Sequence, residues 1–97
     1  MNVKKCNGLA DIRKNIDRLD DRIIKLMSER SGYVRQASRF KTEESGVKDE
    51  SRVAKVLDKI GSLAAKYGMD PEIAREVYKT MINCFINMEM TEFKKNG

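Results

Sequence analysis

The residues of this sequence that could do chemistry are charged side chains at positions where the surrounding pattern predicts apolar ones. A stripe with the three-and-four spacing of a helix runs through Ile12, Ile16, Leu19, Ile23 and Leu26. Continued at the same spacing, this stripe reaches Arg30 and Lys41. Glu89 falls in a second helical row, which consists of Tyr78, Ile82, Phe85 and Phe93. Faces that should be buried therefore carry two cations and an acid.

A buried charge is costly unless it is paired, and the pattern leaves two ways to pair these three. In the first, Glu89 forms an internal ion pair with Lys41 or Arg30. One carboxylate cannot neutralise both cations, however, and Arg52 adds a further positive charge beside the stripe of the next helix. In the second, the excess positive charge faces a cavity and binds an anion. A carboxylate suits such a site, because an arginine guanidinium can hold it with two parallel hydrogen bonds. We interpret Arg30 and Lys41 as the two ends of a carboxylate grip.

The composition excludes several kinds of catalysis. The chain has no histidine and only two cysteines, so it cannot contain a Ser-His-Asp set or a Cys/His zinc site. It also has no Cys-x-x-Cys motif, no glycine-rich phosphate loop and no acidic calcium loop. We therefore expect an enzyme without a metal ion or any other cofactor.

Length and charge predict one globular domain that binds an anion. The 97 residues, 40% hydrophobic and 36% charged with a single proline, are typical of one helical domain covering residues 1–97. Residues 1–41 hold eleven Lys/Arg and five Asp/Glu, a balance of +6 within a total of +5. The anion should bind to this segment. No apolar run approaches the ~18 residues of a membrane span, so we expect a cytoplasmic protein with no membrane partner.

Periodicity and capping residues predict an all-α fold with three helices per chain. The first helix should run from about residue 9 to residue 41, with Ser31-Gly32 as a weak point that could bend it. The second should start near Asp49 and end before Gly68, and the third should run from Pro71 to about residue 93. The connector "KTEESGVKDE" could be a lid over the site or an ordinary loop, with Gly46 as a left-handed cap or loop residue.

The length of the first helix predicts a homodimer. At 1.5 Å per residue, ~33 residues span ~50 Å, whereas a compact domain of this size has a diameter of roughly 32 Å. The two shorter helices cannot cover such a stripe while they also pack on each other. The long helices of two chains should therefore pair. The alternative is a break at Ser31-Gly32 that gives a compact four-helix monomer.

The dimer would also explain Arg13. This residue lies 17 positions before Arg30, hence ~25 Å away along the helix, and it cannot join Arg30 in one site of the same chain. In an antiparallel pair, the start of one helix lies beside the middle of its partner. Arg13 would then enter the site of the second chain.

The sequence resembles the all-helical chorismate mutase family over about residues 6–93. The resemblance is carried by the stretches "GLADIRKNIDRLDDRIIKLMSERSGYVRQASRFK", "ESRVAKVL" and "GMDPEIAREVYKTMIN" and by the late acid Glu89. The sequence around "GLADIR", "ASRFK" and "RV" is similar to that of the isochorismate–pyruvate lyase branch, whose members make salicylate for siderophores. The resemblance implies an intertwined homodimeric helical bundle with two equivalent sites.

The resemblance also implies roles for individual residues. Arg13, from the partner chain, and Arg30 would hold the two carboxylates of the substrate. Lys41 would contact the enolpyruvyl carboxylate and the ether oxygen, and Glu89 would provide the second contact to that oxygen. Arg52 would add positive field, and Asp49 would bind the ring hydroxyl. The substrate would be a small dicarboxylate, chorismate or isochorismate.

These implied roles fit a pericyclic reaction, which needs neither a nucleophile nor a metal. The enzyme would fix the reactive conformer and stabilise the negative charge that grows on the ether oxygen. Two positions depart from the family pattern. Val53 stands where many mutases have Glu, as expected for the lyase branch. Glu89 stands where bacterial mutases have Gln, and it would have to be protonated to donate to the ether oxygen.

We therefore predict a chorismate mutase that converts chorismate to prephenate, in aromatic amino acid biosynthesis, with isochorismate–pyruvate lyase as the alternative. A basic helical DNA-binding module or a helical interaction module would be an alternative of a different class. The cations lie on apolar stripes rather than on a solvated face, which argues against a nucleic-acid partner.

Overall fold

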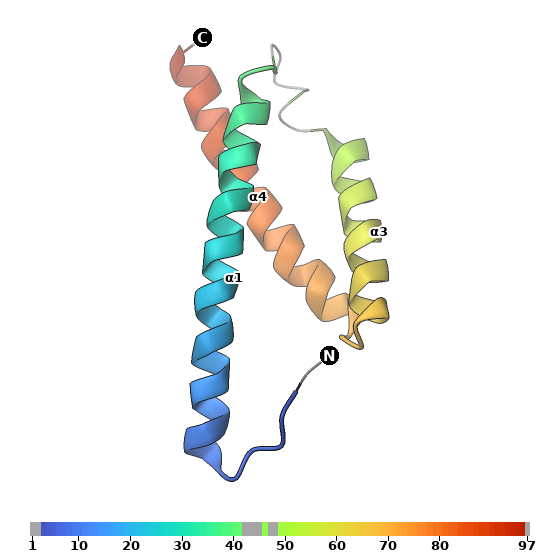
Figure 1. Cartoon of the computed structure of the whole chain (residues 1–97). Helices are drawn as coiled ribbons and strands as arrows, with labels where there is room; N and C mark the ends of the chain where they lie inside the picture. Colours follow the sequence, from blue (N-terminus) through green and yellow to red (C-terminus); the bar gives the residue numbers. More distant parts are fainter. Residues whose placement is uncertain (1–2, 42–45, 47–48, 97) are drawn as a thin grey trace. The chain divides into compact units, whose positions relative to one another are not determined.

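The computed structural model describes residues 3–41, 46 and 49–96, and these residues form three α-helices (Figure 1). The helices are α1 (Leu9–Ser38), α3 (Glu50–Lys66) and α4 (Pro71–Asn96). No described residue lies in a β-strand, which confirms the all-helical fold class. None of the helices in this part of the chain is both long and apolar enough to cross a membrane.

Helix α1 is continuous through Ser31-Gly32. Ser31 Oγ donates a hydrogen bond of 2.7 Å to the Met27 carbonyl oxygen, and the backbone stays helical on both sides. One glycine costs a helix only about 1 kcal/mol, too little to break it here. The break that a four-helix monomer requires is therefore absent from α1, all of which the structure describes.

The end of α1 comes earlier than the sequence predicts. The Phe40 amide donates a hydrogen bond to the Ala37 carbonyl oxygen at 3.1 Å. The Lys41 amide donates one to the Ser38 carbonyl oxygen at 3.2 Å. These i→i−3 bonds tighten the chain after Ser38, as often occurs at a helix terminus. The prediction that the helix continues through Lys41 is wrong by three residues, and Lys41 lies in a turn.

Local capping explains the hairpin that joins α3 to α4. Tyr67 ends α3, and Gly68 follows with a φ of 79°, a backbone that favours glycine. The amides of Met69 and Gly68 return to the carbonyl oxygens of Ala64 and Ala65, which is the Schellman arrangement. Asp70 then caps α4 by accepting a 2.9 Å bond from the Glu72 amide. The predicted start of α4 at Pro71 is confirmed, and its end lies three residues beyond the predicted one.

The chain divides into two compact units, residues 1–36 and 37–97. In the second unit, α3 and α4 pack together next to their turn and diverge away from it (Figure 1). Small residues make the close approach possible: Gly61 and Ala64 on α3 and Ala74 on α4 are buried. The Arg75 guanidinium lies directly against Gly61, in the space that a Cβ would need.

The first unit has no comparable core. None of the residues of α1 is buried, and the side chains of its apolar stripe are 41–66% exposed from Leu9 to Tyr33. Scattered exposed apolar residues are ordinary, but a continuous stripe along about seven helical turns is not. The stripe that the sequence predicts to be buried is therefore left exposed by the residues that the structure describes.

Candidate active site

Lys41 and Glu89 meet in the second unit. Lys41 Nζ donates a 3.0 Å hydrogen bond to Glu89 Oε2, in an ion pair between residues 48 positions apart. The Glu89 side chain is only 5% exposed, whereas that of Lys41 is 27% exposed. The contact is the internal ion pair that the sequence offers as one of its two alternatives. It brings together the two residues that we predicted as catalytic.

This pair retains capacity for further hydrogen bonds. A lysine ammonium has three N–H donors, and the bond to Glu89 uses one of them. A carboxyl group has two oxygens, and the ion pair engages Oε2. Lys41 can therefore stay on Glu89 and still donate to a ligand, and Oε1 of Glu89 can take part in a further hydrogen bond. The ion pair and ligand binding are compatible chemically.

Gly46 lies beside the stem of Lys41. A Cβ built at Gly46 would lie 3.5 Å from Lys41 Cβ and 3.6 Å from its Cγ. The expectation of a left-handed backbone at Gly46 is wrong, because among the described glycines only Gly68 has a positive φ and Gly46 is helical. The rest of the predicted lid, residues 42–45 and 47–48, lies outside the described residues.

Asp49 and Arg52 lie at the start of α3, in the same unit as the ion pair, and both are exposed. Asp49 is the N-cap of this helix, and its Oδ1 accepts a 3.1 Å bond from the Arg52 amide. The cap is a structural reason for an acid at this position. It occupies one carboxylate oxygen, and the second oxygen would be the one to reach a ring hydroxyl. Both residues stay predictions as ligand contacts.

Arg13 and Arg30 belong to the first unit. Arg13 is exposed, and Arg30 is half-buried and engaged by other groups of the chain. Because α1 is one continuous helix between them, the two residues lie about 25 Å apart along its axis. A single chain therefore does not bring its own Arg13 and Arg30 into one site. The sequence predicts this separation.

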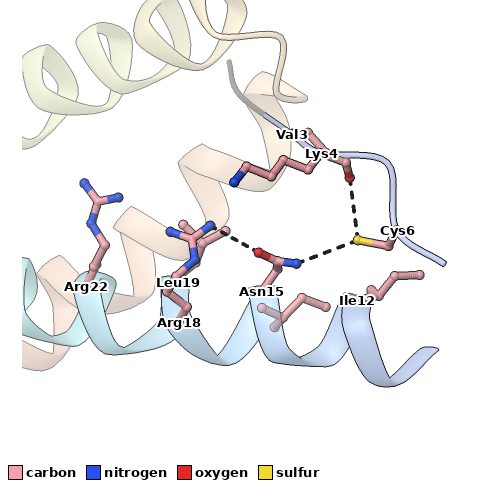
Figure 2. Close-up of a pocket in the computed structure, with 9 residues that line it drawn as sticks. Val3, Lys4, Cys6, Ile12, Asn15, Arg18, Leu19 and Arg22 are labelled. Atoms are coloured by element: carbon pink, nitrogen blue, oxygen red, sulfur yellow. Dashed lines mark hydrogen bonds between the residues drawn. The ribbon is translucent and has the colours of Figure 1, made fainter. Parts of the chain in front are cut away.

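The sequence analysis missed a groove at the start of α1. Residues 3–8 lie along the first turns of the helix, and a cavity of about 810 Å³ separates them from it (Figure 2). Its lining combines apolar, cationic and amide side chains: Val3, Lys4, Cys6, Ile12, Asn15, Ile16, Arg18, Leu19 and Arg22. The available signal was Asn15, a residue that favours local backbone bonds over helix interiors. The described residues contain no cluster of three or more His, Cys, Asp or Glu that could hold a metal ion.

Comparison with known proteins identifies the family. A family model described as chorismate mutase type II matches residues 12–90, most of the chain. This chain belongs to the chorismate mutase type II family. The match covers α1 from its first turn, α3, and α4 through the ion-paired Glu89.

Relatives within the chorismate mutase type II family bear two different enzyme names. The isochorismate pyruvate lyase of Pseudomonas aeruginosa is 37% identical over 81 residues, 84% of this chain and 80% of the relative. The chorismate mutase of Methanocaldococcus jannaschii is 29% identical over 75 residues, 76% of each chain. A bifunctional chorismate mutase/prephenate dehydratase of Buchnera aphidicola is 28% identical over 90 residues, which are 92% of this chain and 23% of that protein. The chain therefore resembles enzymes of both names over most of its length.

Proposed function

We propose that this protein is a cofactor-free enzyme that rearranges chorismate to prephenate. The observation that carries the proposal is the Lys41–Glu89 pair, which presents an ammonium group and a buried carboxyl group together. In this reaction a C–O bond breaks while a C–C bond forms within one molecule, and negative charge grows on the ether oxygen. A donor fixed at that oxygen lowers the barrier because it binds the transition state better than the substrate.

In this proposal Lys41 donates to the ether oxygen and the enolpyruvyl carboxylate while it remains bonded to Glu89. Glu89 carries a proton on Oε1 and donates a hydrogen bond to the same ether oxygen, and the proton stays on Glu89. An ionised Glu89 would repel the growing negative charge, so the protonated form is the active one. Arg30 and Arg13 hold the two substrate carboxylates and keep the side chain folded over the ring, which is a proximity effect. Arg52 adds to the positive electrostatic potential of the site, and Asp49 accepts a hydrogen bond from the ring hydroxyl.

The proposed enzyme is a homodimer in which Arg13 crosses to the partner's site. The exposure of the α1 stripe supports this, because a second copy of α1 would cover it. The ~25 Å between Arg13 and Arg30 also supports it, since only an antiparallel partner helix returns an Arg13 to the middle of α1. Each chain then acts as a single domain with two complete sites per dimer. The cytoplasmic location stays a prediction.

Isochorismate pyruvate lyase activity is the second candidate, and sequence identity favours it. The relative with this name is 37% identical to the chain, against 29% for the Methanocaldococcus relative named chorismate mutase. The same grip would hold isochorismate, whose ether bond breaks while a hydrogen moves to the departing pyruvate. Val53, close to Arg52 at the start of α3, also stands where many mutases have Glu.

A two-substrate assay tests the proposal. The purified protein is offered chorismate and isochorismate separately, without added metal, and the products are identified as prephenate or as salicylate and pyruvate. Prephenate as the main product supports the mutase, and salicylate with pyruvate assigns the lyase instead. Absence of turnover on both substrates refutes the enzyme and favours a helical interaction module.

A mixing experiment tests the shared site. Arg13→Ala and Lys41→Ala should each be inactive as homodimers. If Arg13 crosses the interface, mixed dimers contain one site with both changes and one intact site, so random reassociation restores about a quarter of the wild-type activity. If both residues act within one chain, each mixed dimer has two defective sites and the mixture stays inactive.

A further inference from the structure

The groove beside the start of α1 is held open by a chain of polar contacts. The N-terminal strap, which we define as Val3–Gly8, forms one wall, and the helix forms the other. Arg18 Nη2 donates to Asn15 Oδ1 at 3.5 Å, and Asn15 Nδ2 donates to Cys6 Sγ at 3.7 Å. Cys6 Sγ in turn donates to the Lys4 carbonyl oxygen at 3.5 Å. Figure 2 draws these contacts as dashed lines from the helix to the strap. The two walls are therefore tied together, and the groove is preformed.

Cations gather at one end of this groove. Lys4, Arg18 and Arg22 are among its lining residues, and the described part of the lining contains no acid. Figure 2 shows the Lys4 side chain directed from the strap toward the part of α1 that carries Arg18 and Arg22, whereas Cys6 and Ile12 lie at the other end. None of the three cations forms an ion pair with a residue that the structure describes. This end of the groove is therefore suited to an anion.

The floor of the groove is apolar. Ile12, Ile16 and Leu19 line it and are 41–50% exposed. From the first to the last they extend over about two helical turns, or about 10 Å along the axis. The cavity volume of about 810 Å³ lies in the range of about 300–1,000 Å³ that is usual for small-molecule sites. The groove thus offers room for an apolar body next to a place for an anionic head.

The donors at the cationic end favour a carboxylate as this head. A guanidinium has five N–H donors in a planar fork that matches the two oxygens of a carboxylate. Arg18 uses one donor on Asn15, and Arg22 lies one helical turn farther on, so both can hold the same carboxylate. A molecule charged along its whole length, such as a nucleic acid, fits less well, because part of its charge would lie on the apolar floor.

We propose that the groove between the strap and α1 is a binding site for an amphipathic carboxylate. The head lies among Lys4, Arg18 and Arg22, and the apolar body lies along the floor. None of the residues predicted for the candidate active site lines this groove. The floor also belongs to the stripe that the proposed homodimer buries, so occupation of the groove opposes dimer formation. This consequence, unlike the binding itself, rests on the proposed function.

Calorimetric titration with sodium octanoate tests the binding. Hexanoate has the same head and a shorter body, and octylammonium has the same body with the opposite charge. Each methylene that leaves water is worth about fourfold in affinity, so octanoate should bind about tenfold more tightly than hexanoate. Octylammonium should not bind. Absence of octanoate binding, or equal affinities for octanoate and either control, would overturn the proposal.

Cys6 reports where the probe binds. It is a half-buried lining residue, whereas Cys84 is exposed on α4 and does not line the groove. At ten times its dissociation constant, octanoate should slow the alkylation of Cys6 by iodoacetamide about tenfold and leave Cys84 unchanged. Peptide mass spectrometry measures both rates. Protection of neither cysteine, or equal protection of both, would overturn the assignment to the groove.

Arg22→Gln and Lys25→Gln form a matched pair for the head. Both residues are exposed cations of α1, but only Arg22 lines the groove. Contacts of exposed charges contribute modestly, so Arg22→Gln should weaken octanoate binding about threefold, and the double change with Arg18→Gln about tenfold. Lys25→Gln should bind octanoate as the wild type does. Equal losses in Arg22→Gln and Lys25→Gln would overturn the placement of the carboxylate.

Sedimentation over a protein concentration series tests the effect on the dimer. With octanoate at ten times its dissociation constant, mass action on two protomers should raise the apparent dimer dissociation constant about a hundredfold. An unchanged constant with octanoate bound would overturn the competition and leave the binding site standing. A wild type that is monomeric at every concentration would overturn the proposed homodimer instead, and the titrations would still decide the groove.

Discussion

The stability of the protein should respond very differently to the loss of Lys41 and to the loss of the Glu89 carboxylate. Lys41→Met keeps the length of the side chain but removes the ammonium, which leaves the Glu89 carboxylate 95% buried without its partner. Glu89→Gln leaves an amide oxygen that can still accept from Lys41. Lys41 is also 27% exposed and can bind water. We therefore expect Lys41→Met to destabilise the protein more than Glu89→Gln.

The magnitudes follow from these exposures. Breaking a buried ion pair on one side typically costs 3–5 kcal/mol, and because Lys41 is partly solvated the low end applies, about 3 kcal/mol. Replacing a charged acceptor by a neutral one that keeps the bond costs about 1 kcal/mol. The difference of about 2 kcal/mol corresponds to a gap in Tm of roughly 8–16 °C for a chain of this length. Urea unfolding monitored by circular dichroism, at one fixed protomer concentration, measures both variants against the wild type.

The comparison of the two variants provides the decisive check. Equal losses of stability in Lys41→Met and Glu89→Gln would refute the assignment of Glu89 as a buried carboxylate held by Lys41.

Three further predictions concern helix geometry and catalysis. Gly68→Ala should lower the free energy of unfolding by about 1 kcal/mol because of the positive φ at this position. Gly32→Ala, in an open helical position, should raise it by about 0.5–1 kcal/mol. Equal effects in urea unfolding would contradict the assigned backbone. Gly61→Ala should destabilise the protein because its Cβ meets the Arg75 guanidinium, and the same change in an Arg75→Ala background should cost less, which a double-mutant cycle measures. Glu89→Gln should retain much of the wild-type kcat/KM because the amide keeps a donor for the ether oxygen, whereas Glu89→Ala should lose it. Equal kcat/KM in the two variants would remove Glu89 from the proposed role.

The three helices were predictable because each combines a periodic apolar stripe with recognisable ends. Asp49, Gly68 and Asp70 act as caps in the structure, and they lie at or next to the helix ends that the sequence predicts. The end of α1 was less predictable, since the tightening of residues 39–41 into i→i−3 turns leaves no distinct residue signature. Helix ends are commonly uncertain by one or two residues for this reason.

The candidate site was predictable only where one chain suffices. The meeting of Lys41 and Glu89 follows from two charges on two apolar stripes, which must find each other or a ligand. The groove at the start of α1 could not be anticipated, because it depends on how residues 3–8 lie against the helix rather than on periodicity. The grouping of Arg13 with Lys41 depends on a second chain, so it stays a prediction.

The lack of any buried residue in α1 has a consequence for how the protein folds. An isolated helix in water is marginal, and most helical stability in proteins comes from packing of an apolar face. The α3–α4 hairpin has its own small core, whereas α1 must gain its protection from association. Amide hydrogen exchange should therefore slow in α1 as protein concentration rises, while the exchange of amides near Ala64 and Ala74 changes less. At low expression, α1 would be the segment that proteases cut first, so the amount of enzyme in a cell would depend on its own rate of synthesis.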